Sequence, residues 1–376
     1  MKSYVNPCCA LGRLSGRVNC LLSGAIFLLA SAASGTTYLV RPDGSGDFPN
    51  IQAAVNAAAR GDVIELADGV FAGPGNRAID FSGKAITVRS RSGSPRDCVI
   101  DATGGDDYPG GFYFVMEEGP DSEVEGILIT NGHSYLFGGA IYCDEGSSPT
   151  LRRCIFSHNF AMEGGGGVAC MHWSNPNIVE CVFEENSTAG VYGAGGLWAH
   201  LSSPIVTDCT FTRNTADCAP GAMVWFSSAV FTNCTFYANQ SRACVRGDAL
   251  MIQESALVIL RSTIVAFHEH PEPIWCALSG PAGRGVELDC CDLFGNGDGD
   301  WVGCVADQYG ERGNICADPL FCDPEDGDLH LDYNSPCAPP SPDPQCGLIG
   351  AWPIGCGAPT VVRELSWGRI KKLYHE

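Results

Sequence analysis

The sequence predicts an all-β fold, a right-handed parallel β-helix with an N-terminal amphipathic helical cap, and two observations lead there. An eight-residue phrase recurs and closes on Cys154, Cys181, Cys209 and Cys234, at steps of 27, 28 and 25 residues. A phenylalanine follows each cysteine two residues later and an asparagine five residues later; these rows are Phe156, Phe183, Phe211 and Phe236, and Asn159, Asn186, Asn214 and Asn239. Such repetition is typical of solenoids, in which each unit buries its apolar face against its neighbours.

Within each coil, the cysteine and the phenylalanine are expected to point inward from one strand, because side chains alternate with a period of two. The asparagines are interpreted as a turn ladder, with amides bonding along the stack and a left-handed backbone. A glycine-rich corner precedes a second apolar strand, as in GGGVAC at 165–170 and GAGGLW at 193–198. Aligning these two segments places Trp198 beside Cys170, pointing inward.

A leucine-rich repeat is the rival fold, since the Leu-x-x-Cys-x-Phe-x-x-Asn spacing and a period near 28 also satisfy its skeleton. That fold requires an apolar helix in the second half of each unit. Here the second half is short, rich in glycine and poor in leucine. We therefore expect a parallel β-helix.

Five segments are expected along the chain. Residues 1–35 carry basic residues, a short apolar run and small residues, the pattern of a secretory signal peptide. Residues 36–62 form the N-terminal cap, with an apolar stripe at helical spacing, and residues 63–300 form the coils. A cysteine-rich end covers 301–356, and a basic tail covers 357–376.

Charge limits the partners. The formal net charge is -21, and loss of the three basic residues of the signal segment would bring it to about −24. Nucleic acids and anionic lipids need basic surfaces, so neither is an expected partner. No stretch of the mature chain is long and apolar enough to span a membrane. The expected location is therefore secreted or at the cell surface.

Of the 21 cysteines, 18 remain after the signal segment, and an even number in an exported chain favours disulfides. They are expected above all in the last third, at Cys276, Cys290, Cys291, Cys304, Cys316, Cys322, Cys337, Cys346 and Cys356. The cysteines of the repeat either stack as buried thiols or bridge neighbouring coils, and the sequence leaves both open.

Three stretches carry a resemblance to known families. The pairing of Phe156-Ser157-His158-Asn159 with Gly138-Gly139-Ala140-Ile141 resembles the repeats of polymorphic outer-membrane proteins. The opening DGSGDFPNIQAAVNAA is similar to the entry of pectin-lyase-like β-helices, and the ending ADPLFCDPEDGDLHLDYNSPC is similar to the closing coils of secreted bacterial β-helix proteins. The resemblance implies architecture more than activity, because a fold does not carry a function with it.

The catalytic segments of pectin methylesterases and polygalacturonases do not occur in order in the coils. The candidate catalytic row is His158, Glu185 and Arg213, each four residues past its cysteine, since side chains about 4.8 Å apart on stacked coils tune one another's pKa. The alternative is a surface salt-bridge row of small energetic value. Glu180 and Asp208, near Arg153, form a second acidic row.

Two further sites are candidates. Trp173 lies in a loop and is a candidate ligand-binding side chain, because an exposed indole stacks on sugar rings. Asn296, Asp298 and Asp300 have the alternating oxygens of a calcium loop, although the closing glutamate is missing. No cofactor is expected, and calcium is the one cation for which ligands can be named.

These features predict an exported, non-catalytic protein that recognises a glycan or another cell-surface component. The alternative is a polysaccharide lyase or glycoside hydrolase whose site lies on the outer face of the coils. A tight titratable cluster in a groove would favour the alternative.

Overall fold

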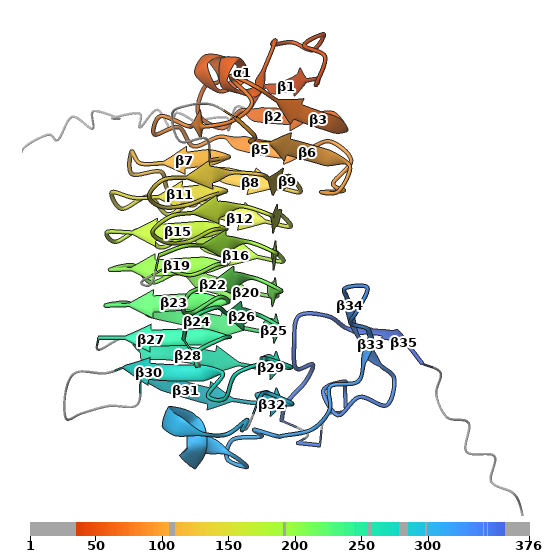
Figure 1. Ribbon diagram of the computed structural model, residues 1–376. Coiled ribbons are helices and arrows are strands. Elements are labelled where there is room, and N and C mark those ends of the chain that lie inside the picture. The colour runs from red at the N-terminus through yellow and green to blue at the C-terminus, as the bar shows by residue number, and fades with distance from the viewer. Residues whose placement is uncertain are drawn as a thin grey trace, which may run out of the picture. The chain divides into compact units, whose positions relative to one another are not determined.

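The computed structural model describes residues 35–357, except 105–109, 191–192, 245, 255–256, 278–284, 298, 341 and 344. The predicted signal peptide, the basic tail from 358 onward and Asp298 lie outside the described residues. The described chain forms a right-handed parallel β-helix, as predicted, whose strands stack in four parallel sheets, here called A to D (Figure 1).

Sheets A and B carry the repeated phrase and the Cys-Phe strand. Sheet A contains, in order, β1 (Thr37–Val40), β2 (Val63–Leu66), β5 (Thr87–Ser90), β8 (Glu123–Glu125), β12 (Thr150–Arg152), β16 (Asn177–Val179), β20 (Ile205–Thr207), β24 (Ser228–Thr232), β28 (Leu257–Arg261) and β31 (Val286–Asp289). Sheet B contains β3 (Gly69–Ala72), β6 (Cys98–Asp101), β9 (Leu128–Thr130), β13 (Ile155–Ser157), β17 (Val182–Glu184), β21 (Thr210–Thr212), β25 (Thr235–Tyr237), β29 (Ile264–Ala266) and β32 (Asp292–Phe294).

Sheets C and D complete the coils. Sheet C contains β4 (Ile79–Asp80), β7 (Phe112–Phe114), β11 (Ile141–Cys143), β15 (Val168–Met171), β19 (Leu197–His200), β23 (Ala222–Trp225), β27 (Leu250–Gln253) and β30 (Ile274–Ala277). The narrow sheet D contains β10 (His133–Ser134), β14 (Phe160–Ala161), β18 (Ser187–Thr188), β22 (Thr215–Ala216) and β26 (Gln240–Ser241). A 3-10 helix, η1 (Gly303–Gln308), follows the coils, and a three-stranded C-terminal sheet contains β33 (Phe321–Asp323), β34 (Asp328–Asp332) and β35 (Ile354–Cys356).

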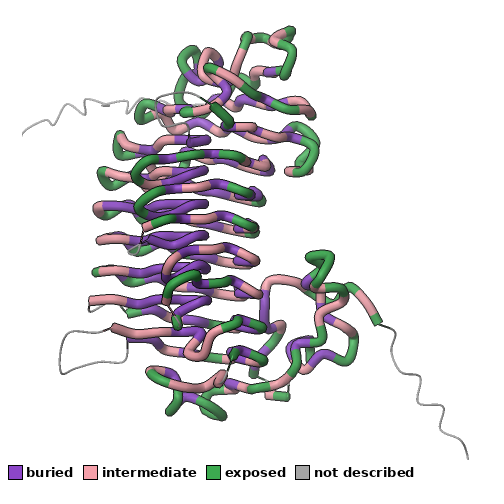
Figure 2. The backbone as a smooth tube through the Cα atoms, in the orientation of Figure 1, coloured by how far each residue is buried: buried purple, intermediate pink, exposed green. Residues whose placement is uncertain are grey.

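The core runs along the axis of the coils, where Figure 2 shows buried segments on each turn. The repeated phenylalanines pair in register on β13, β17, β21 and β25 and are fully buried. The rings of Phe183 and Phe211 stack with centroids 4.4 Å apart, and those of Phe211 and Phe236 lie 4.6 Å apart. Stacked aromatic rings contribute beyond the area that they bury, so this column ties neighbouring coils together.

A ladder of buried asparagines runs beside the phenylalanines. The Nδ2 amide of Asn159 donates to Oδ1 of Asn186. The amide of Asn186 donates to Asn214 in the same way, and that of Asn214 donates to Asn239. The left-handed backbone expected at the asparagines lies instead on the residue before each one, with φ of 57° at His158 and 56° at Glu185. The preceding residue makes the turn, which leaves each asparagine to point inward and bond along the stack.

At the N-terminal end, the predicted apolar stripe forms helix α1 (Ile51–Ala57), and the side chain of Asn50 caps it by accepting a hydrogen bond from Ala53 N. Its residues Ile51, Ala54 and Val55 are buried in the same core cluster as the coils. The helix contacts β1, β2 and β4 and therefore covers the first coil on one side. Among the described residues, no helix is long and apolar enough to cross a membrane.

Four disulfides are present among the described residues. Three lie in the last third of the chain, where they were expected, and join Cys276 to Cys304, Cys290 to Cys346 and Cys322 to Cys356. The expectation was wrong for Cys291, Cys316 and Cys337, which are free thiols, and it missed the Cys218–Cys244 bridge between coils. The repeated cysteines are free and buried, which decides between the two open alternatives in favour of a thiol column.

Candidate functional site

A row of exposed and half-buried side chains follows the corner where sheet C turns into sheet A. Trp173, Leu201, Phe226 and Glu254 occupy this corner on successive coils, each with a left-handed φ, of 67°, 53°, 49° and 57°. Trp173 N donates to Leu201 O, and Leu201 N donates to Trp225 O, so the parallel hydrogen bonding continues into the turn. Because a left-handed residue turns the strand, its side chain points outward.

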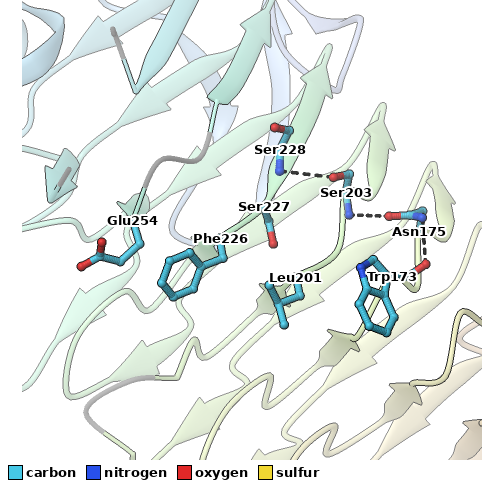
Figure 3. Close-up of a pocket in the computed structure, with 8 residues that line it drawn as sticks. All are labelled: Trp173, Asn175, Leu201, Ser203, Phe226, Ser227, Ser228 and Glu254. Atoms are coloured by element: carbon cyan, nitrogen blue, oxygen red, sulfur yellow. Dashed lines mark hydrogen bonds between the residues drawn. The ribbon is translucent and has the colours of Figure 1, made fainter. Parts of the chain in front are cut away.

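This corner row is open to solvent. The Trp173 residue is 71% exposed and Phe226 is 49% exposed, while Leu201 lies between them on the middle coil. Stacked coils rise by about 4.8 Å, so the two rings are roughly 10 Å apart along the axis. The arrangement is an apolar track that runs along the solenoid (Figure 3).

A polar row lies beside the corner row and consists of the residues two positions further along the chain on each coil. Ser203 N donates to Oδ1 of Asn175 at 2.5 Å, and Ser228 N donates to the hydroxyl of Ser203 at 3.2 Å (Figure 3). Asn175 Nδ2 also donates to Trp173 O at 2.8 Å, which fixes the amide. The two rows, with Ser227 and Glu254, line an open hollow of about 450 Å³. Apolar side chains and hydrogen-bonding groups therefore share one surface.

Buried and half-buried aromatic rings support this surface from the outer face of sheet C. The rings of Trp198 and His200 stack at 5.6 Å, His200 lies 5.0 Å from Trp225, and Trp225 stacks on Phe226 at 5.8 Å. The prediction for Trp198 was wrong: it pairs with Ala169, not Cys170, so it points outward. It is nevertheless 4% exposed, because it packs into a separate apolar cluster over sheet C.

A chain of three polar groups holds the residue before Trp173. His172 Nδ1 lies 2.8 Å from Asp144 Oδ1, and the Tyr142 hydroxyl donates to Asp144 Oδ2 at 2.5 Å. Burial opposes ionisation of Asp144, but its hydrogen bonds from Tyr142, the backbone and His172 lower its pKa. Burial is the main cause that lowers the pKa of His200, and the neighbouring His172 lowers it further. The ring centres of His172 and His200 lie 6.0 Å apart. The carboxylate thus fixes the His172 ring beside the corner row.

The predicted catalytic row is only partly assembled. His158 Nε2 and Glu185 Oε2 lie 2.5 Å apart on an exposed turn, and His158 Nδ1 contacts the Ser157 hydroxyl at 2.7 Å. Arg213 does not join them: its guanidinium donates to the backbone carbonyls of Pro324 and Glu325, at 2.7 and 2.6 Å. These hydrogen bonds of Arg213 therefore hold the C-terminal segment against the coils.

In the other two predicted sets, Asp208 and Asp300 accept hydrogen bonds from neighbouring residues of the fold. Asn233 donates to Asp208 Oδ1 at 3.0 Å, and Arg153 pairs with Glu125 rather than with Glu180. Asp300 Oδ1 accepts hydrogen bonds from both the backbone and the side chain of Asn296, at 2.8 and 2.9 Å, which ends the amide ladder. Within the described residues, no three histidine, cysteine or acidic side chains are grouped to hold a metal ion. The calcium prediction stays a prediction, since Asp298 is not described.

The sequence predicted that Trp173 is exposed, but not that Leu201, Phe226 and the polar row lie beside it. The repeated phrase itself indicates the polar row. Its second residue is Asn175, Ser203 or Ser228 in the copies SNPNIVEC, SSPIVTDC and SSAVFTNC, respectively. The first letters form a second, buried ladder, in which Ser174 N donates to Ser202 Oγ and Ser202 N donates to Ser227 Oγ. The phrase was interpreted for its cysteine alone.

The fold and this surface define a right-handed parallel β-helix with an exposed aromatic corner. A family model described as a right handed beta helix region matches residues 71–197. No curated protein matches the chain. A crystal structure of pectate lyase Pel9A is similar over 86% of this chain and 97% of its own, at 14% identity and a TM-score of 0.43.

Two further solved structures are similar at lower scores. A pectin methylesterase from carrot covers 77% of this chain and 91% of its own, at 12% identity and a TM-score of 0.34. A mannuronic acid specific polysaccharide family 6 lyase from human gut microbiota covers 69% of this chain and 81% of its own, at 14% identity and a TM-score of 0.26. At these identities the likeness concerns the fold alone.

Proposed function

We propose that this chain is an exported glycan-recognition protein that binds without cleaving, and that a glycan lies along the corner row. The observation that carries the proposal is the alignment of the exposed Trp173 and Phe226 with the half-buried Leu201 between them, on three successive coils. Aromatic faces pack against the apolar faces of sugar rings, and a repeating ligand matches a repeating surface. The four disulfides agree with an oxidising compartment.

The polar row supplies groups that can form hydrogen bonds with sugar hydroxyls. Sugar hydroxyls both donate and accept, and so do the Asn175 amide and the hydroxyls of Ser203 and Ser228. Glu254, on the fourth coil of the row, adds a carboxylate, and the whole chain carries a net charge of -21. A polyanionic glycan would be repelled, so the expected ligand is a neutral or amino-sugar-containing chain.

The test is a titration of the purified protein with a panel of neutral, amino-sugar and acidic oligosaccharides, with binding and chain cleavage scored separately. Trp173→Ala is expected to weaken binding by about fivefold, since an exposed aromatic contact contributes on the order of 1 kcal/mol. The matched control is Tyr309→Ala, because Tyr309 is also an exposed aromatic residue (58%) but lies after the coils. Equal binding by both variants and the unchanged protein would contradict the proposed site.

Cleavage is the outcome that would replace this proposal by the alternative, a lyase or a hydrolase. The residues to test are His158 and Glu185, whose Nε2 and Oε2 atoms lie 2.5 Å apart on the outer turn of the coils. New chain ends that disappear in a Glu185→Gln variant would place the chemistry at that pair. Binding without new ends, sensitive to Trp173→Ala, supports recognition.

A further inference from the structure

A second surface lies over the outer face of sheet B, where the C-terminal part of the chain returns to the coils. Residues 350–352 lie along the outer face of sheet B: Gly350 N donates to Ser262 O at 2.8 Å, and Ala351 N donates to Thr235 Oγ1 at 3.0 Å. Trp352 Nε1 donates to Thr210 Oγ1 at 2.8 Å. These contacts fix the indole of Trp352 over the sheet.

Two hollows of about 420 Å³ each meet at this indole. Both are lined by Trp352 together with Ile155 and Val182, which project from β13 and β17. The hollows therefore share an apolar floor and an aromatic wall. Volumes of this size are typical of sites for small molecules.

The charges around the hollows favour a cation. Five carboxylates line them (Glu180, Glu184, Asp208, Asp326 and Asp328), against three guanidinium groups (Arg96, Arg153 and Arg213). The imidazole of His330 also lines one hollow, where its Nδ1 lies 2.7 Å from Asp328 Oδ1 and its ring lies 4.9 Å from that of Trp352. Each guanidinium is already engaged, by Glu184, by Glu125 and by the carbonyls of Pro324 and Glu325, respectively.

The acidic side chains are less fully used. The first hollow is the one lined by Glu180 and Asp208, and the second is the one lined by Asp326 and Asp328. Among the described residues, no hydrogen bond or ion pair engages the carboxylate of Glu180 in the first hollow or that of Asp326 in the second. An anionic ligand would face this excess of negative charge without a free arginine to bind it. A cationic ligand would meet an unpaired carboxylate in each hollow.

A buried hydroxyl in the second hollow also lacks a partner. Thr212 lines this hollow and is 7% exposed, and its Oγ1 has no hydrogen-bond partner among the described residues. A buried hydroxyl without a partner costs free energy, so a ligand N–H placed there would be stabilised. This feature is independent of the carboxylates and points to a ligand with a polar group, such as an N–H, because a hydroxyl can accept as well as donate a hydrogen bond.

We propose that the two hollows together bind a linear polyamine. Its alkyl chain would lie on Ile155 and Val182, and one ammonium group would face Glu180 and Asp208. The second ammonium group would face Asp326, with Thr212 Oγ1 as an acceptor. The face of Trp352 adds a cation–π attraction, which is stronger in a partly desolvated site. The site is separate from the corner row, so this proposal does not depend on the glycan function.

The test is a calorimetric titration with spermidine at low ionic strength, where charges act over about 30 Å. Saturable binding with one spermidine per chain is expected, and octane-1,8-diol, which has the alkyl chain without the charges, should not bind. The double variant Glu180→Gln with Asp208→Asn should bind at least about tenfold more weakly, because two charged contacts are removed while the side-chain shapes remain. Thr212→Val should weaken binding by a smaller factor.

The matched control is Glu117→Gln. Glu117 is exposed and has a left-handed φ of 58°, close to the 54° of Glu180, but it lies on an earlier coil. Unchanged binding by this control and weakened binding by the double variant support the site. Absence of saturable binding up to about 1 mM spermidine would overturn the proposal, and so would an equal loss in the control. Should the double variant fail to fold, Asp326→Asn, between β33 and β34, gives the same comparison.

Discussion

The side-chain carbonyl of Asn186 accepts two hydrogen bonds from Asn159, one from its backbone N–H at 3.1 Å and one from its side-chain amide at 3.0 Å. The amide of Asn186 in turn donates to Phe156 O at 2.8 Å. Both asparagines are fully buried, so every one of these polar groups depends on its neighbour for a partner.

Removing one rung of this ladder is expected to destabilise the coils. Asn186→Ala leaves two buried donors of Asn159 without an acceptor, and each costs roughly 1–3 kcal/mol. We expect the free energy of unfolding to fall by about 3 kcal/mol in denaturant titrations. Asn56→Ala is the control, because Asn56 is exposed on α1. A loss below about 1 kcal/mol for Asn186→Ala would mean that water replaces the missing amide.

His268 takes the place of an asparagine in the same ladder and should make stability depend on pH. Its Nδ1 lies 2.7 Å from Asn296 Oδ1, and its Nε2 lies 3.3 Å from the Asn239 amide, so the neutral ring donates to one neighbour and accepts from the other. Burial lowers the pKa of His268 from 6.5 to about 4.

Because the pKa of His268 is lower in the folded chain than in the unfolded chain, folding stability decreases as the pH falls. As the pH falls from about 6.5 to about 4, the unfolded chain binds a proton at His268 that the folded chain does not, so folding stability falls by up to about 3 kcal/mol. His268→Asn removes this titration and keeps a ladder amide. We expect the stability difference between His268→Asn and the unchanged protein to grow over this pH range in urea titrations. A constant difference would show that His268 titrates normally in the fold.

The buried thiol column should resist alkylation. Burial raises the pKa of Cys234 to about 12 and that of Cys181 well above its usual value, and neither is solvent-accessible. Cys316 is exposed, and partial burial and the carboxylate of Asp300 raise its pKa to about 11. Iodoacetamide at about pH 8 should therefore label Cys316 slowly in the native protein, because the thiolate reacts.

Peptide mass spectrometry distinguishes the sites. The column cysteines should be labelled only after denaturation, and Cys316→Ser should abolish native labelling of the described free cysteines. Native labelling of Cys181 at the rate of Cys316 would show that the coils open locally.

The corner row offers a gain-of-function test of the proposed glycan function. Leu201 lies between Trp173 and Phe226 and shares their left-handed backbone, which Trp173 already shows to be compatible with an indole. Leu201→Trp adds a third ring to the track and is expected to tighten glycan binding by roughly threefold to tenfold. Ile205→Trp is the control, since Ile205 is also exposed but lies on sheet A. Equal effects of both substitutions would indicate nonspecific adhesion.

The sequence was sufficient for the solenoid and for the inward direction of the repeated cysteines and phenylalanines. The period near 28 fixes the stacking of equivalent strands, and the alternation of Cys181 and Phe183 fixes the buried face, because both follow from local geometry. The exposed Trp173 was also predictable, since it follows a strand in a polar loop.

The sequence was not sufficient for which side chains meet. The corner row depends on the register between coils of unequal length, and a one-residue misalignment was enough to turn Trp198 inward in the prediction, because neighbouring strand positions face opposite sides. Arg213 contacts Pro324, 111 residues further along the chain, and no repeat encodes that return. Local periodicity thus determined the scaffold, whereas the surfaces depend on long-range contacts, which form only once the coils are stacked and the C-terminal segment has packed against them.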